Sequence, residues 1–170
     1  TGQKDMLDDA GTGTTYDVIH AWFHPWFHKF QQDGGYYDVF LFDAEGNLVY
    51  SVFKELDFAT NFGDSNPGQW ADTDLGTVFR EAMKAGEVGK VAFTDFQPYA
   101  PSADAPAGFI STPVVNLGGE VIGVLALQMP IDELSNIMAA PDGLGETGEL
   151  LMVGDDGLLR NDSRFSPDVN

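Results

Sequence analysis

The chain has 170 residues, of which 43% are hydrophobic, and this size suits one domain with a sizeable core. Its 27 acidic and 8 basic side chains give a net charge of −19, which argues against nucleic-acid and membrane-surface partners because both surfaces are anionic. The lack of cysteine excludes a disulfide framework, a thiolate zinc site and a cysteine nucleophile. No apolar run reaches the length of a transmembrane helix.

Residues 1–13 are polar and are expected to be frayed, and a helix is predicted over residues 16–32. Thr14 or Thr15 is a suitable cap for this helix, and the glycine pair 34–35 ends it. Pro25 removes one helical hydrogen bond and is expected to bend the helix or split it in two. Five aromatic side chains are expected to pack the helix on the sheet or on a twin helix, with the histidines at the rim: Trp22, Phe23, Trp26, Phe27 and Phe30.

Three histidines at helical spacing, His20, His24 and His28, give the strongest metal signal in the sequence. On a straight helix the outer two lie about 12 Å apart, so at most two of them can share one zinc ion. The metal candidates are therefore His24 and His28, which would need a further ligand from elsewhere in the chain. Packing without metal is the favoured interpretation, because histidines at this spacing are common in proteins that bind none.

An antiparallel hairpin is predicted over residues 36–54, where two apolar runs flank a turn that contains Gly46. A fainter copy of this pattern covers residues 150–163, with Gly157 in the place of Gly46. The repeat predicts that a second module of the same design begins near the end of this sequence.

The other elements are expected to complete a sheet of five mostly antiparallel strands with helices packed against it, which is an α+β architecture. They are a loop over 55–69, a helix over 75–85 with an apolar stripe, a strand over 91–96, a proline-rich loop over 97–106, a hairpin of strands 107–115 and 120–129, and a short helix over 131–138.

Three stretches resemble the distal module of a double Cache domain, the PAS-like sensor of bacterial chemoreceptors and sensor histidine kinases. They are FLFDAEGNLVYSVFKELDFATN at 40–61, DFQPYAPS at 95–102 and ISTPVVNLGGEVIGVLALQMPIDELSNIM at 110–138. From Gly143, GLGETGELLMVGDDGLLRNDSRF resembles the opening of the membrane-proximal module. The resemblance implies a helix region at 1–35, a Cache module at 36–140, and at 141–170 a linker with the first hairpin of an incomplete second module.

The function that this resemblance implies is ligand sensing on the periplasmic side of the bacterial inner membrane. The full receptor would be anchored in the membrane, would form a homodimer through the helix at 16–32, and would transmit a conformational change caused by a small solute of unknown class. No cofactor is expected. The alternatives are a ligand-free module for dimerisation or partner docking, and a metal sensor that uses His24 and His28.

In the amino-acid-binding branch of the family, an Arg-x-Trp-Tyr segment at the start of the middle helix binds the ligand carboxylate, and an aspartate on the last strand binds the amine. The corresponding positions here are 76–79, with the sequence Gly-Thr-Val-Phe, and Gln128. Both charges are missing, so the resemblance implies that α-amino acids are not the ligand.

A ligand pocket is expected between the last three strands and the loops that cover them, with polar groups set in an apolar lining. The predicted polar side chains are Asp95, Tyr99, Ser111 and Gln128, and the predicted apolar ones are Trp70, Phe93 and Phe109. Structural roles are open for the polar four: Asp95 as a turn cap, Tyr99 as a half-buried anchor, and Ser111 and Gln128 as solvated or internally paired strand residues.

An enzymatic role for this chain is not expected. The sequence has no Gly-x-Ser-x-Gly elbow, no phosphate-binding glycine-rich loop with lysine and no His-Glu-x-x-His helix. Carboxylate pairs are abundant only because acidic residues are abundant, so none of them identifies an acid and a base.

Overall fold

The computed structural model describes residues 3–140 and 142–165 of the chain. These residues form two compact units, which divide between Met129 and Pro130. Among the described helices, none is both long and apolar enough to cross a membrane.

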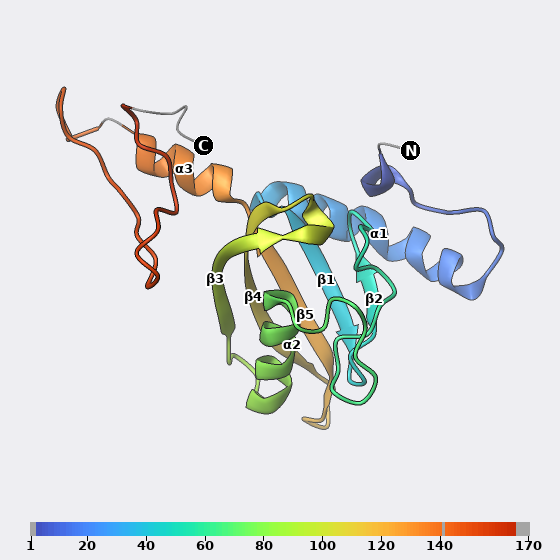
Figure 1. The fold of residues 1–170 in the computed structure, drawn as a ribbon. Coiled ribbons are helices and arrows are strands. Elements are labelled where there is room, and N and C mark those ends of the chain that lie inside the picture. Colours follow the sequence, from blue (N-terminus) through green and yellow to red (C-terminus); the bar gives the residue numbers. More distant parts are fainter. Residues whose placement is uncertain (1–2, 141, 166–170) are drawn as a thin grey trace. The chain divides into compact units, whose positions relative to one another are not determined.

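The first unit is built on a five-stranded sheet with the strand order β2-β1-β5-β4-β3, in which every neighbouring pair is antiparallel. Helices α1 and α2 lie on opposite faces of this sheet (Figure 1). The elements are η1 (Lys4–Met6), α1 (Thr15–Gly34), β1 (Asp38–Asp43), β2 (Leu48–Ser51), α2 (Asp74–Ala85), β3 (Ala92–Tyr99), η2 (Ala100–Ser102), β4 (Ala105–Val115) and β5 (Val121–Met129). The predicted α+β class, with a long N-terminal helix, is confirmed.

Two apolar cores result from the alternation of side chains along the strands. From β1, Phe40 and Phe42 belong to the larger core, which contains the apolar stripe of α2. Val39 and Leu41, also from β1, belong to the smaller core, which Phe27 and Phe30 of α1 and Tyr50 of β2 complete. The hairpin that was predicted around Gly46 is therefore the strand pair that both helices cover.

The proline-rich segment 97–106 differs from the prediction. It was expected to be a loop, but β3 continues to Tyr99 and Pro98 lies opposite Pro106 in the β3–β4 pairing. Strand β3 is at the edge of the sheet, where a proline can lie without the loss of a ladder hydrogen bond. Pro106 lies in the first residues of β4, before the pairing with β5 begins at Gly108.

Helix α1 begins at its predicted cap, because Thr14 Oγ1 accepts a hydrogen bond from the Asp17 N–H at 3.3 Å. It ends before Gly35, whose φ of 68° is the left-handed conformation that glycine adopts at little cost. Pro25 does not split it, since the helix continues through this residue.

The expected position of the histidines at the rim of α1 is wrong, and the two tryptophans of this helix do not pack on the sheet. Trp22 and Trp26 are 79% and 62% exposed, whereas His20 and His24 are buried. The reason is that the segment before α1 is ordered and covers the histidines: His20 Nδ1 lies 2.7 Å from the carbonyl oxygen of Asp8. Of the five aromatic side chains that were expected to pack, only Phe27 and Phe30 contact the buried core of the sheet.

His24 is a satisfied interior histidine. Its Nδ1 lies 2.7 Å from the Tyr50 hydroxyl and its Nε2 lies 2.7 Å from the carbonyl oxygen of Asp5. Burial lowers the pKa of His24 to about 4, so the ring is neutral at pH 7. A metal ion at His24 would have to displace one of these two hydrogen bonds, and no group of three metal-binding side chains occurs in the described part of the chain.

The second unit contains α3 (Ile131–Ala139) and a short hairpin. Val153 and Leu159 form an antiparallel bridge across a turn in which Gly157 has a φ of 79°. This bridge lies in the predicted second hairpin, 150–163. Of the module that was predicted for 141–170, residues 141 and 166–170 lie outside the described residues, and its assignment as a second Cache module stays a prediction.

The path of the chain after β2 depends on one buried carboxylate. Asp38, which is 0% exposed, accepts hydrogen bonds through Oδ1 from the N–H groups of Val39 and Val52, at 2.6 and 2.8 Å. A longer bond, at 3.4 Å, comes from the N–H of Phe53. Asp38 thus turns the chain at the end of β2 and directs residues 53–60 across the sheet.

Replacement of Asp38 by alanine is expected to destabilise the first unit by roughly 3 kcal/mol, because buried N–H groups lose their acceptor. Urea denaturation at pH 7 followed by tryptophan fluorescence measures this change. The control is Asp33→Ala, which removes an exposed carboxylate and its ion pair with Lys29 and should cost less than about 0.5 kcal/mol. Equal midpoints for the two variants would contradict the role of Asp38.

Candidate ligand site

The two ends of the sheet face that α2 covers have different chemistry. At one end, Ser111 Oγ donates a hydrogen bond to the Val78 carbonyl of α2 at 2.8 Å. At the other end, Asp38, Gln128 and Phe109 lie opposite one another on β1, β5 and β4. Side chains of paired residues share a face of the sheet, so this row presents a carboxylate, an amide and a ring to whatever covers it.

Two segments cover this second end: residues 53–60, which follow β2 and which we call the covering segment, and η2, which follows β3. Tyr99 donates its hydroxyl hydrogen to Asp57 Oδ2 at 2.7 Å. Glu55 accepts hydrogen bonds from the Tyr37 hydroxyl at 3.0 Å and from Ser102 Oγ at 2.7 Å. We refer to the resulting group as the carboxylate cluster; its members are Tyr37, Asp38, Glu55, Asp57, Tyr99, Ser102 and Gln128.

Asp57 is the least satisfied member of the cluster. Its side chain is 0% exposed, and its Oδ1 has no hydrogen-bond partner. Burial, assisted by the nearby charge of Glu55, raises the pKa of Asp57 to about 6, although the hydrogen bond from Tyr99 acts in the opposite direction. A buried carboxylate oxygen without a donor is rare in folded proteins and calls for a partner.

The backbone over the cluster is strained. In the covering segment, Lys54 and Ala59 have φ angles of 50° and 61°. In the turn after η2, Ala103 and Asp104 have φ angles of 56° and 60°. Non-glycine residues in this conformation cost of order 1 kcal/mol each, and they are concentrated at ligand clamps and switch regions.

Four of the seven predicted site residues lie at or beside the cluster. Tyr99 and Gln128 are members, and the ring of Phe109 is in edge-to-face contact with that of Tyr99, with 5.0 Å between centroids. Trp70 Nε1 donates to the carbonyl oxygen of Leu56 at 3.1 Å and so supports the covering segment.

The other three predicted residues lie elsewhere. Ser111 is bonded to α2, and Phe93 is 54% exposed on the edge strand. Asp95 accepts a hydrogen bond from the N–H of Phe96 at 2.8 Å, and its charge adds to burial in raising the pKa of Asp74 at the start of α2. The structure thus does not bring all seven together at one place.

Sequence reasoning missed Tyr37, Asp38, Glu55, Asp57 and Ser102. A signal existed for Asp38, because a carboxylate within an apolar strand has to be partnered or exposed. No comparable signal marked Asp57, since an acidic residue in a predicted loop is ordinary in a chain with 27 acidic residues.

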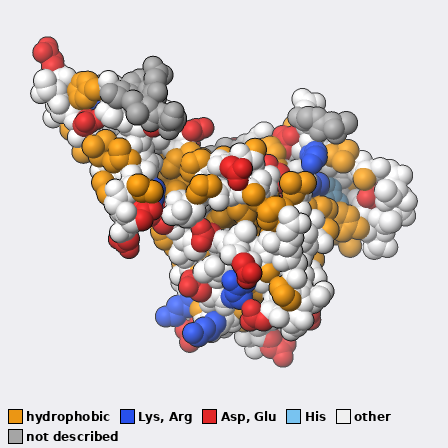
Figure 2. Space-filling model, in the orientation of Figure 1, with side chains coloured by type: hydrophobic (Ala, Val, Ile, Leu, Met, Phe, Trp, Pro, Cys, Tyr) orange, Lys and Arg blue, Asp and Glu red, His pale blue; other side chains and the backbone are white. Residues whose placement is uncertain are grey.

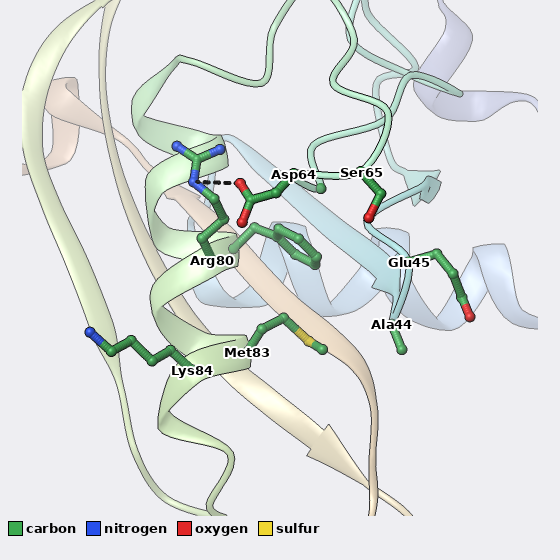
Figure 3. A pocket seen from close by; sticks show the side chains of 9 residues that line it. Ala44, Glu45, Asp64, Ser65, Arg80, Met83 and Lys84 are labelled. Carbon is green, nitrogen blue, oxygen red and sulfur yellow. Dashed lines mark ion pairs between the residues drawn. The ribbon is translucent and has the colours of Figure 1, made fainter.

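An open groove of about 710 Å³ lies at a different place, between the β1–β2 turn, residues 63–65 and α2 (Figure 3). Its most prominent cation is already used: Arg80 donates to the carbonyl oxygen of Ala71 at 2.7 Å and lies 3.9 Å from Asp64 Oδ1. None of the predicted site residues lines it. The groove is lined by Ala44, Glu45, Gly63, Asp64, Ser65, Phe79, Arg80, Met83 and Lys84.

The net charge of −19 disfavours an anionic partner. Figure 2 shows acidic side chains spread over the visible face, with few lysine or arginine side chains among them. We therefore take the carboxylate cluster, with its buried unpartnered oxygen, as the candidate ligand site.

The fold matches that of solved sensor domains. The ligand-binding domain of the Campylobacter jejuni chemoreceptor Tlp3, in complex with L-valine, superposes with a TM-score of 0.57 at 16% sequence identity, over 93% of this chain and 58% of that chain. The sensor domain of the V. cholerae histidine kinase DctB superposes with a TM-score of 0.52 at 16% identity, over 72% of this chain and 41% of that chain. Neither a protein-family model nor a curated protein sequence matches the chain.

The chain therefore has the fold of the Cache-type sensor domains of chemoreceptors and histidine kinases. It spans about half the length of these solved domains. At this level of identity the similarity establishes the fold, and the ligand has to be argued from the site.

Because the folded-state pKa of Asp57 is about 6, above the ordinary value of 3.8, its protonated form stabilises the fold at low pH and this contribution is lost as pH rises through 6. Asp57→Asn is therefore expected to raise the free energy of unfolding by about 1–3 kcal/mol at pH 7.5, with little effect near pH 4.

Urea denaturation from pH 4 to 8 tests this difference. The control is Asp72→Asn, which changes an exposed carboxylate and should leave the free energy of unfolding unchanged from pH 4 to 8. A difference between wild type and Asp57→Asn that does not change with pH would show that Asp57 ionises normally.

Proposed function

We propose that the chain is the ligand-sensing part of a bacterial transmembrane receptor, a chemoreceptor or a sensor histidine kinase, located on the extracytoplasmic side of the inner membrane. The observation that carries this proposal is the buried carboxylate cluster, with its unpartnered Asp57 oxygen, on the fold of a sensor domain. The chain itself binds and does not catalyse; any enzymatic output belongs to other domains of the receptor.

Binding would act through the covering segment 53–60. Asp57 is inaccessible while this segment is closed, whereas Tyr37 and Glu55 are partly exposed. A ligand that reaches Asp57 must therefore bind when the segment has opened, and it favours whichever arrangement gives it more contacts. The signal is the resulting shift between two positions of the segment, transmitted through the sheet and α1.

The test is a thermal-shift screen of organic acids, amines, sugars, purines and amino acids, with hits confirmed by calorimetry. A ligand of the cluster is expected to raise the melting temperature in a concentration-dependent manner. Gln128→Ala should weaken its binding about tenfold or more, because Gln128 is a member of the cluster.

Asp95→Ala is the matched control, since Asp95 was predicted for the same site but lies beside Asp74. It should leave the affinity within about twofold, because surface changes away from a site have small effects. Loss of binding in Asp95→Ala with full binding in Gln128→Ala would place the site at α2 and reject the cluster.

A second proposal concerns self-association through α1. One side of this helix exposes large apolar side chains, which are Val18, Ile19, Trp22, Phe23 and Trp26. Their spacing of three and four residues forms one continuous stripe, as in a helix that pairs with a partner helix. We propose that this stripe forms a homodimer contact in the full receptor.

The double variant Trp22→Ser with Trp26→Ser is expected to weaken self-association by at least tenfold, because exposed tryptophans are common anchors of interfaces. Sedimentation equilibrium of the purified domain measures the dimer constant. Leu117→Ser is the control, because Leu117 is fully exposed at the tip of the β4–β5 hairpin. Equal dimer constants in the three proteins would remove α1 as the interface.

A further inference from the structure

The carboxylate cluster has used all the donors that its hydroxyl groups can supply. The hydroxyl hydrogens of Tyr37 and Ser102 go to Glu55, and that of Tyr99 goes to Asp57 Oδ2. Gln128 Nε2 donates to Ser102 Oγ at 3.3 Å. No hydroxyl hydrogen is left for Asp57 Oδ1, and the second N–H of the Gln128 amide does not bond to it, so a partner of this oxygen has to bring a hydrogen of its own.

Among the described residues, Glu55 and Asp57 have no ion-pair partner, although the charge of Asp38 acts on the nearby Lys54 ammonium. The nearest cation in the sequence, Lys54, donates to the Val52 carbonyl at 3.1 Å and lies over the ring of Tyr50, 5.6 Å from its centroid. Tyr50 belongs to the core on the α1 side of the sheet, so this ammonium group does not neutralise Asp57.

The arrangement does not suit a metal ion. A divalent cation needs several oxygen or nitrogen ligands around one point, and the described residues contain no group of three acidic or histidine side chains that can hold one. Asp57 Oδ1 needs only one donor, which a single polar group of an organic ligand can supply.

We propose that the ligand of the carboxylate cluster is a primary amine, bound as its alkylammonium ion with an N–H donated to Asp57 Oδ1, and that it carries no carboxylate. This inference rests on the proposed function and specifies its ligand class. A ligand carboxylate would meet Glu55 and Asp57 without a positive side chain to offset the repulsion. The part of the ligand away from the ammonium would contact Phe109, whose ring packs on Tyr99, and Trp70, which is bonded to the Leu56 carbonyl.

The experiment is calorimetry and thermal shift of the whole chain at pH 7.5 with three amines: ethanolamine, putrescine and propylamine. Glycolate, propionate and β-alanine are the matched probes that carry a carboxylate. At least one amine is expected to bind, whereas the carboxylate probes are not.

Asp57→Asn keeps the shape of the side chain but removes its charge, and it is expected to weaken amine binding by about ten- to a hundredfold. Tyr99→Phe removes the hydroxyl that positions the same carboxylate and should weaken binding by a smaller factor. Asp72→Asn should bind as wild type does. Circular dichroism of each variant distinguishes loss of binding from loss of folding.

Failure of this inference differs from failure of the proposed function. If a carboxylate or a neutral compound from the broad screen binds and its binding is lost in Gln128→Ala, the cluster is a sensor site but the amine inference is wrong. If amine binding survives Asp57→Asn unchanged, the inference is also wrong. If no compound of any class binds, both proposals are rejected.

Discussion

The carboxylate of Asp38 is the interaction on which the site depends. It is buried between β1 and β2 and collects the N–H groups of Val39, Val52 and Phe53, so the chain leaves β2 in a fixed direction. Burial raises the pKa of Asp38 well above its ordinary value even though these N–H groups favour the charged form. Burial of this acid is unfavourable, but its hydrogen bonds fix the start of residues 53–60. They thereby place Glu55 and Asp57 over the polar end of the sheet.

The same face of the sheet serves stability at one end and recognition at the other. Near α2, the polar Ser111 is satisfied by a main-chain carbonyl and the surrounding core is apolar. Near η2, the polar groups satisfy one another in a chain that leads from Gln128 through Ser102 to Glu55, and they leave Asp57 incomplete. Both ends share strands β4 and β5, which also pack against α2.

Most of the fold was predictable because strand alternation and turn residues are local properties of the sequence. The orientation of α1 was not predictable, because aromatic side chains and histidines occur on both sides of this helix. The buried side is the one that residues 3–9 cover, through contacts with His20 and His24, and these residues were expected to be frayed. The site was half predictable. Phe109 and Gln128 stand out as an aromatic and a polar residue on central strands, and Tyr99 as the aromatic residue of the proline-rich segment, whereas Asp57 acquires its significance only through burial by tertiary contacts.

The closed arrangement of the cluster has a cost that a small ligand can offset. Two non-glycine residues of the covering segment have positive φ, at about 1 kcal/mol each, and the raised pKa of Asp57 corresponds to about 3 kcal/mol when that carboxylate is ionised. A ligand at a hundred times its dissociation constant contributes about 2.7 kcal/mol. Because these energies are of the same order, a ligand that satisfies Asp57 changes which position of the segment is favoured, whereas a ligand that only contacts the rim does not.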